Sequence, residues 1–251
     1  MERAGRESVI GAAVRKTAEL LRNGSTSTSP DGGNAPRLHF MGEEVDETGK
    51  TSLEKATVTL IIKRSHERFL PPGYNKCAVV KKLHLQAVHD SWAAFLAGAS
   101  PTFRAHVEED DSGRVMSPVT FFYDLFWARL FTVAPRLRAL FGDNMVRQSR
   151  CLIRMTCEIA GLLEALAAGR GTAGLEAVAH ANIEIGLRAE HYEPLAAVLR
   201  HALEFCLGEP AWTPLVAESW MRAIAVFVNA SVSVTVAALE DGARQETEAE
   251  Q

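Results

Sequence analysis

The stretch FFYDLFWARLFTVAPRLRALFG, residues 121–142, holds seven of the eighteen aromatic residues in the chain. Ser117 and Pro118 stand just before it, and they supply a capping side chain followed by proline at the first helical position. The pattern therefore predicts a helix that starts there and runs to Pro135. An aromatic stripe at helical spacing is typical of ordinary core, and it also suits the wall of a cofactor pocket.

Helical spacing of apolar residues continues on both sides of this stretch, from about Val79 to Ala238. The spacing predicts a first helix that stops at Gly98, after which residues 99–116 interrupt the pattern with Pro, Gly and an acidic run. Later helices are expected over 146–169, over a short segment that ends near Gly186, over 190–208, and from Thr213-Pro214 onward. The predicted fold class is all-α.

The two ends of the chain have a different composition. Residues 24–36 are rich in Ser, Thr, Gly and Pro, which cannot bury enough apolar surface to offset chain entropy. We expect a largely disordered N-terminal extension over 1–76, a folded domain over 77–240 and a disordered polar tail over 241–251. Within the extension, TVTLIIKR (57–64) fits a short strand or a helical turn equally well.

Charge and cysteine usage limit the class of protein. The net charge is −4 and lysine and arginine are scattered along the chain, which predicts no nucleic-acid partner. The apolar run 223–239 contains four polar residues and is short for a membrane span, so a buried helix is expected there. The four cysteines lack CxxC spacing and predict reduced thiols in a cytoplasmic protein: Cys77, Cys151, Cys157 and Cys206.

Five motifs in order carry a resemblance to a known family: HDSWAAF, LFWARLFTVAPRLRALFG, Gln148 with Leu152 four residues later, LRAEHYEPLAAVL, and EFCLGEPAWTPLVAESW. Between Leu83 and Val234 the chain resembles the globins, especially the flavohaemoglobin-like and neuroglobin-like branch. The resemblance implies a globin fold with an N-terminal extension and a long insertion between the first two helices. It also implies haem b as the cofactor.

The resemblance assigns several residues to a haem pocket. Phe141 matches the phenylalanine that packs on the ring, and Trp127 matches a distal position where an indole narrows the space for a ligand. Gln148 matches the distal residue, whose amide donates a hydrogen bond to iron-bound oxygen. The remaining expected contacts are an apolar wall at Leu152, a ring contact at Leu187 and a propionate partner at Arg150.

The iron ligand has two possible registers. His180 lies 32 residues after Gln148, the separation found in relatives, whereas a gapless match backward from AEHY puts Asn182 at the proximal position. Two residues along a helix correspond to a rotation of about 200°, so both cannot face the same ring. Imidazole is the usual proximal ligand, and His180 is therefore the predicted metal ligand.

Three functions follow as expectations. The first is a globin that reversibly binds oxygen, nitric oxide or carbon monoxide for storage, scavenging or sensing. The second is nitric oxide dioxygenation with an external reductase, since the chain has no dinucleotide fingerprint. The third is a regulatory or scaffold protein with a globin fold that has lost haem, suggested by Trp127 and by the insertion 99–116.

Overall fold

The computed structural model describes residues 39–40, 57–59, 64–74, 79–109, 116–142, 144–167 and 170–249. The chain divides into two units, Met1–Ala35 and Pro36–Gln251, and every described residue belongs to the second. The predicted linker at 24–36 lies outside the described residues.

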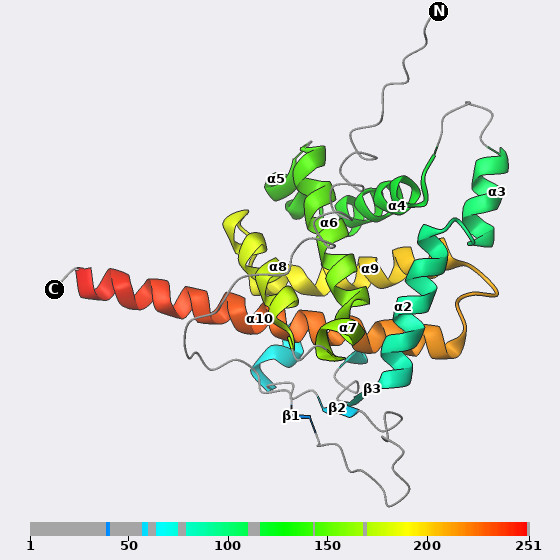
Figure 1. Ribbon diagram of the computed structural model, residues 1–251. Helices are drawn as coiled ribbons and strands as arrows, with labels where there is room; N and C mark the ends of the chain where they lie inside the picture. The colour runs from blue at the N-terminus through cyan, green and yellow to red at the C-terminus, as the bar shows by residue number, and fades with distance from the viewer. Residues whose placement is uncertain are drawn as a thin grey trace, which may run out of the picture. The chain divides into compact units, whose positions relative to one another are not determined.

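Helices dominate the second unit, which confirms the all-α prediction (Figure 1). The α-helices are α2 (Lys82–Leu96), α3 (Pro101–Glu109), α4 (Pro118–Val133), α5 (Arg138–Phe141), α6 (Met145–Ala160), α7 (Leu162–Ala167), α8 (Ala173–Glu184), α9 (Tyr192–Leu207) and α10 (Pro214–Ala249). The described residues also form three 3-10 helices: η2 (Arg64–Phe69), η4 (Pro135–Leu137) and η5 (Ala189–His191).

A small antiparallel sheet of order β1-β2-β3 precedes α2. Its strands are β1 (His39–Phe40), β2 (Thr57–Thr59) and β3 (Val79–Lys81), and Val58 pairs with Val80. The stretch 57–64, which sequence alone left open, therefore begins as a strand and ends where η2 starts.

The aromatic helix α4 begins and ends where its sequence indicates. The Ser117 side chain accepts a hydrogen bond from the Thr120 backbone amide at 3.1 Å, and the helix stops at Val133, two residues before Pro135. Its inward face includes Phe122 and Phe126, both fully buried. The Phe122 ring meets Trp92 and Phe95 of α2 at centroid distances of 5.3 and 6.2 Å, so the aromatic stripe joins α4 to α2.

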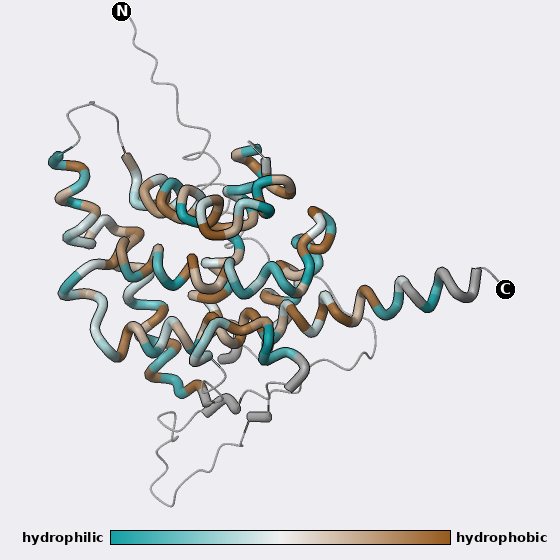
Figure 2. Tube along the Cα trace, turned by 180° about the vertical axis from the view of Figure 1, so that it is seen from behind, coloured by the Kyte–Doolittle hydropathy of each residue, from teal (hydrophilic) through white to brown (hydrophobic). Residues whose placement is uncertain are grey.

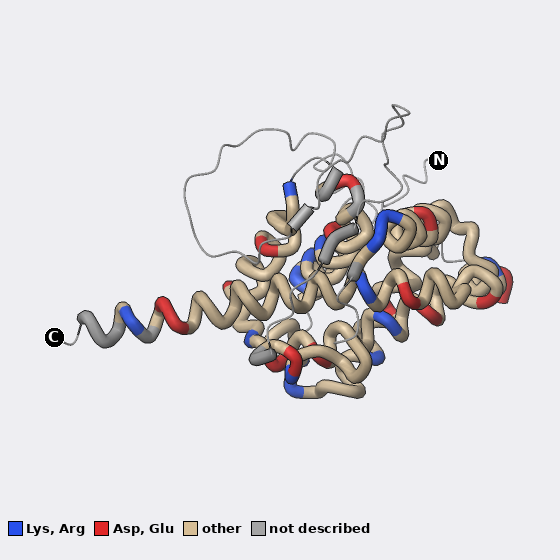
Figure 3. The backbone as a smooth tube through the Cα atoms, turned by 90° about the horizontal axis from the view of Figure 1, so that it is seen from below, with Lys and Arg blue, Asp and Glu red and all other residues tan. Residues whose placement is uncertain are grey.

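Helix α10 contacts α2, α8 and α9 along its first half (Figure 1). Residues 223–232 are buried, which confirms the predicted buried helix for this part of the run 223–239, whereas residues 237–239 are exposed. From Pro214 to Gly242 the helix is long and apolar enough to span a bilayer, a property that buried core helices share. Figure 2 shows the change from apolar to polar residues toward its C-terminal end, and Figure 3 shows charged residues there.

The boundaries of the folded part differ from those predicted. Leu70 and Tyr74 are buried in the core and His66 lies 3.4 Å from the Ser233 hydroxyl, so packing begins before residue 77. At the other end, α10 continues as a helix through 241–249, where a disordered tail was expected. The earlier start of the folded part is explained by the apolar side chains in η2 and in the segment after it.

The predicted insertion 99–116 contains a helix, α3, that packs on α9. The Ser100 hydroxyl donates to the Cys206 carbonyl oxygen, and the Phe103 and Phe121 rings lie 5.9 Å apart. At the end of α9, Gly208 has φ +63° and ψ 172°, and a Cβ there would lie 2.0 Å from Thr102 Oγ1. This junction requires glycine.

Gly208→Ala is expected to lower the free energy of unfolding by about 3 kcal/mol, because it adds backbone strain and a clash with α3. Gly171→Ala is the matched control: Gly171 also has positive φ, but a Cβ there meets nothing within 4 Å. Its expected loss is about 1 kcal/mol. Urea unfolding followed by circular dichroism measures both, and equal losses would show that the contact with Thr102 costs nothing.

Candidate functional site

Trp127 and Phe141, two residues expected beside a haem, lie in the interior of the unit. Their ring centroids are 4.6 Å apart, and both side chains are almost fully buried. The Trp127 indole also meets Phe131 at 5.4 Å and Phe126 at 5.1 Å. The indole is thus enclosed by other rings, and its Nε1 has no hydrogen-bond partner in the described part of the chain.

Gln148, the expected distal residue, is buried on the first turn of α6. The Tyr123 hydroxyl donates to its Oε1 at 2.5 Å, and its Nε2 donates to the Gly142 carbonyl oxygen. Both ends of the amide are therefore used within the protein, where they tie α6 to α4 and to the turn after α5. The Tyr123 contact could not be foreseen, since nothing in the sequence pairs these residues.

The other predicted pocket residues separate into two groups. Leu152 and Leu187 are fully buried and belong to the same continuous core as Trp127 and Phe141. Arg150 is exposed on α6. The structure thus brings the apolar members of the predicted set together and leaves the predicted propionate partner at the surface.

On α8 the inward face carries Asn182, while His180 is exposed. The buried positions Leu175, Val178 and Ala179 continue the helical stripe to Asn182, which is only 2% exposed. This i, i+3, i+4, i+7 pattern is visible in the sequence and would have selected Asn182 rather than His180. His180, predicted as the metal ligand, therefore does not point into the core.

Asn182 lies in a buried polar cluster between α6, α8, α9 and α10. Its Oδ1 accepts a hydrogen bond from the Cys151 thiol at 3.5 Å, whereas its Nδ2 has no partner atom among the described residues. Burial raises the pKa of the Cys151 thiol to about 12, so this cysteine stays protonated at neutral pH. Burial likewise raises the pKa of Tyr192, whose hydroxyl lies close to Asn182, Ser231 and Thr235.

The geometry of this cluster does not fit a haem. A flat ring between two packed groups needs about 7 Å between their atoms, twice an ordinary contact distance of about 3.5 Å. Cys151 Sγ and Asn182 Oδ1 are 3.5 Å apart, so α6 and α8 touch directly beside Asn182, one of the two candidates for the proximal position. The amide of Asn182 is also a poor iron ligand.

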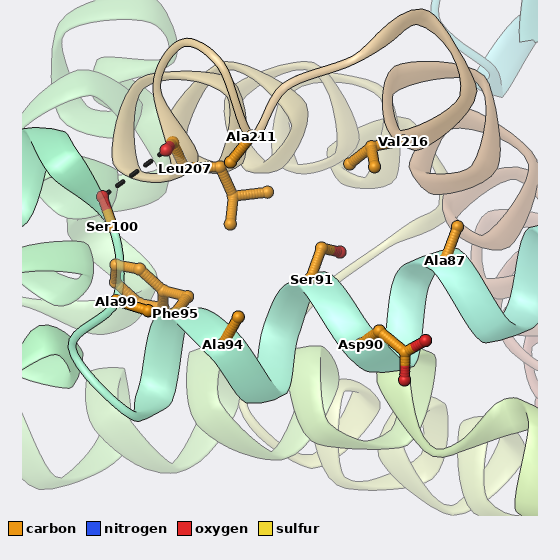
Figure 4. Close-up of a pocket in the computed structure, with 10 residues that line it drawn as sticks. All are labelled: Ala87, Asp90, Ser91, Ala94, Phe95, Ala99, Ser100, Leu207, Ala211 and Val216. Carbon is orange, nitrogen blue, oxygen red and sulfur yellow. Dashed lines mark hydrogen bonds between the residues drawn. The ribbon is translucent and has the colours of Figure 1, made fainter.

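A cavity of about 320 Å³ lies elsewhere, between α2 and the segment that joins α9 to α10 (Figure 4). Ser91 points toward it, but the Ser91 hydroxyl already donates to the Val88 carbonyl oxygen and accepts from Trp220 Nε1. The Asp90 carboxylate points away from it in Figure 4 and accepts from Gln86. The cavity lacks convergent free polar groups, so it has the shape of a small pocket without the chemistry of an active site.

Within the described ranges, no three His, Cys, Asp or Glu side chains come together as a metal site. The chain matches no known protein-family model, and no curated protein matches it significantly. The candidate site is therefore defined by geometry alone: the buried polar cluster around Asn182, in the same unit as the buried residues Trp127, Phe141, Gln148, Leu152 and Leu187.

Proposed function

We propose that this protein is a globin-like helical protein that works without haem, as a regulatory or scaffold protein. The single observation that carries the proposal is the direct contact between Cys151 and Asn182. It closes the space that a haem would need between α6 and α8. The ordered motifs support a globin-like arrangement, and the closed interior favours the loss of the cofactor over gas binding or nitric oxide chemistry.

The polar groups of the interior support the same proposal. The Gln148 amide makes hydrogen bonds with Tyr123 and Gly142, so it is not available to a bound gas. His180 is exposed, and the described residues offer no second imidazole at the inward position of α8. With no ring held at this site, the proposed function requires neither a gas ligand nor a reductase.

The cysteines favour a cytoplasmic location for such a protein. Three free thiols lie in the described part of the chain, at Cys151, Cys157 and Cys206. Burial raises the pKa of Cys157 to about 11 and that of Cys206 to about 12, so both are protonated and unreactive at neutral pH. Reduced, buried thiols are typical of intracellular proteins, and we include this location in the proposal.

Addition of haemin to the purified full chain is expected to give no Soret band beyond that of free haemin, while circular dichroism shows a folded helical protein. The reason is that no room and no imidazole are present at Asn182. The His180→Ala variant serves as the control and should behave identically. A stoichiometric Soret band that His180→Ala abolishes would overturn the proposal and restore the haem-binding function.

A further inference from the structure

Positive charge is concentrated in one part of this acidic protein. Residues 129–154 contain six arginines and one aspartate, a net charge of +5, whereas the whole chain carries −4. The remaining residues therefore sum to −9. The net charge of the whole chain does not reveal this separation of charge, and the prediction of scattered basic residues therefore missed it. We call the exposed arginines of this segment the basic corner: Arg129, Arg136, Arg138, Arg147, Arg150 and Arg154.

All six arginines of the basic corner are exposed, and no salt bridge joins any of them to another described residue. Arg147, Arg150 and Arg154 lie at i, i+3 and i+7, so they line one face of α6 over about 10 Å. Local contacts hold two of the six arginines in place: Arg147 donates to the Leu140 carbonyl oxygen at 2.8 Å, and Arg138 packs 4.9 Å from the Phe131 ring centre.

Acidic side chains also lie close to the basic corner. Glu158, which is half-buried, follows Arg154 by four residues on α6 and therefore continues the same face of the helix. Glu190 lies near His191, and so do Arg136 and Arg188. Burial is the main cause of the lowered pKa of His191, and the two arginines lower this pKa further. Glu190 offsets part of the charge of Arg136.

Exposed aliphatic side chains accompany this charge. Val146 lies on the first turn of α6, four residues before Arg150 and on the same side of the helix, and it is 54% exposed; Val133 at the end of α4 is 50% exposed. In Figure 1, α4 and α5 lie at the end of the unit remote from β1–β3, so this surface is not covered by the sheet.

We propose that the basic corner binds an anionic lipid surface. Guanidinium groups pair with lipid phosphates through two parallel hydrogen bonds, and aliphatic side chains enter the boundary between headgroups and acyl chains. Nucleic acid would use the same charge, but single-stranded nucleic acid favours exposed aromatic rings for stacking, and the exposed large apolar residues of this corner are aliphatic. The inference concerns the outer surface and goes beyond the proposed function.

Vesicle sedimentation with the full chain tests this proposal, using phosphatidylcholine alone or with about one third phosphatidylserine. Binding is expected to the anionic vesicles only, and to weaken as salt is added. The variant Arg147→Gln/Arg150→Gln/Arg154→Gln is expected to bind roughly 100-fold more weakly, since each surface arginine contributes about fivefold. Circular dichroism verifies that the variant is folded.

The control variant Arg170→Gln/Arg200→Gln/Arg244→Gln removes the same charge from exposed positions outside the basic corner. It should keep most of the binding, and a loss equal to that of the α6 variant would overturn the proposal. Val146→Ser should weaken vesicle binding without changing the net charge. The proposal would also be overturned if the natural chain bound no vesicles, or if it bound heparin equally well and Val146→Ser had no effect. None of these outcomes depends on the haemin titration.

Discussion

Phe122→Ala is expected to lower the free energy of unfolding by about 3–5 kcal/mol, the usual cost of removing a buried phenylalanine ring. Phe122 has no exposed surface, and its ring contacts Trp92 and Phe95 of α2 and Phe126 of its own helix. The surrounding rings are held by several elements and cannot collapse into the space left behind. Urea unfolding followed by tryptophan fluorescence measures the change.

Phe131→Ala is the matched control, because it removes the same ring from the same helix. Phe131 is only half-buried, with Arg138 packed over one face of its ring. Its loss is expected to cost about 1 kcal/mol, the sum of modest burial and a weak cation-π contact. Equal effects of the two variants would mean that the aromatic stripe of α4 is not the centre of the core.

Local chemistry explains why the helices of this chain could be predicted. Ser117 and Pro118 fix the start of α4, Pro135 ends it, and Gly208 ends α9 with a backbone angle that favours glycine. These signals act over a few residues, so sequence alone reveals them. The helix in the insertion was missed because the acidic run hid the packing of Phe103 against Phe121.

The candidate site was harder to predict because it depends on how distant helices meet. Compared with the globin pattern, the chain has two extra residues, which lie either before or after α8. Motif spacing could not decide between these positions, and therefore could not decide between His180 and Asn182. The apolar stripe that ends in Asn182 decides it in favour of the asparagine. The contact between Cys151 and Asn182 bridges 31 residues, and no local pattern encodes such a contact.

The second large effect is expected at the closed interior itself. Asn182→Asp replaces the side-chain amide with a carboxyl group of the same shape. The new carboxyl group lies beside Cys151, at a position that is 2% exposed. No cationic side chain is recorded in contact with Asn182 among the described residues. Burial disfavours the ionised form, so the pKa of the new carboxyl group should rise above its unfolded value of about 3.9.

The sign of the pH dependence follows from this raised pKa. Below about pH 3 the carboxyl group is protonated in both the folded and the unfolded chain, so the variant should be nearly as stable as the natural protein. As pH rises, the unfolded chain ionises first, and the stability deficit grows until the folded pKa is reached. A pKa rise of roughly two units corresponds to a loss of about 3 kcal/mol at pH 7.

Asn144→Asp provides the control for this experiment. Asn144 is exposed, and its side chain caps α6 by accepting from the Arg147 amide at 3.0 Å, a role that aspartate fills equally well. Its change in stability should stay within about 0.5 kcal/mol at neutral pH. Urea unfolding at several pH values between 4 and 7 separates the two sites. A deficit for Asn182→Asp that does not grow with pH would mean that water reaches Asn182, and the closed interior on which the haem-free proposal rests would then be wrong.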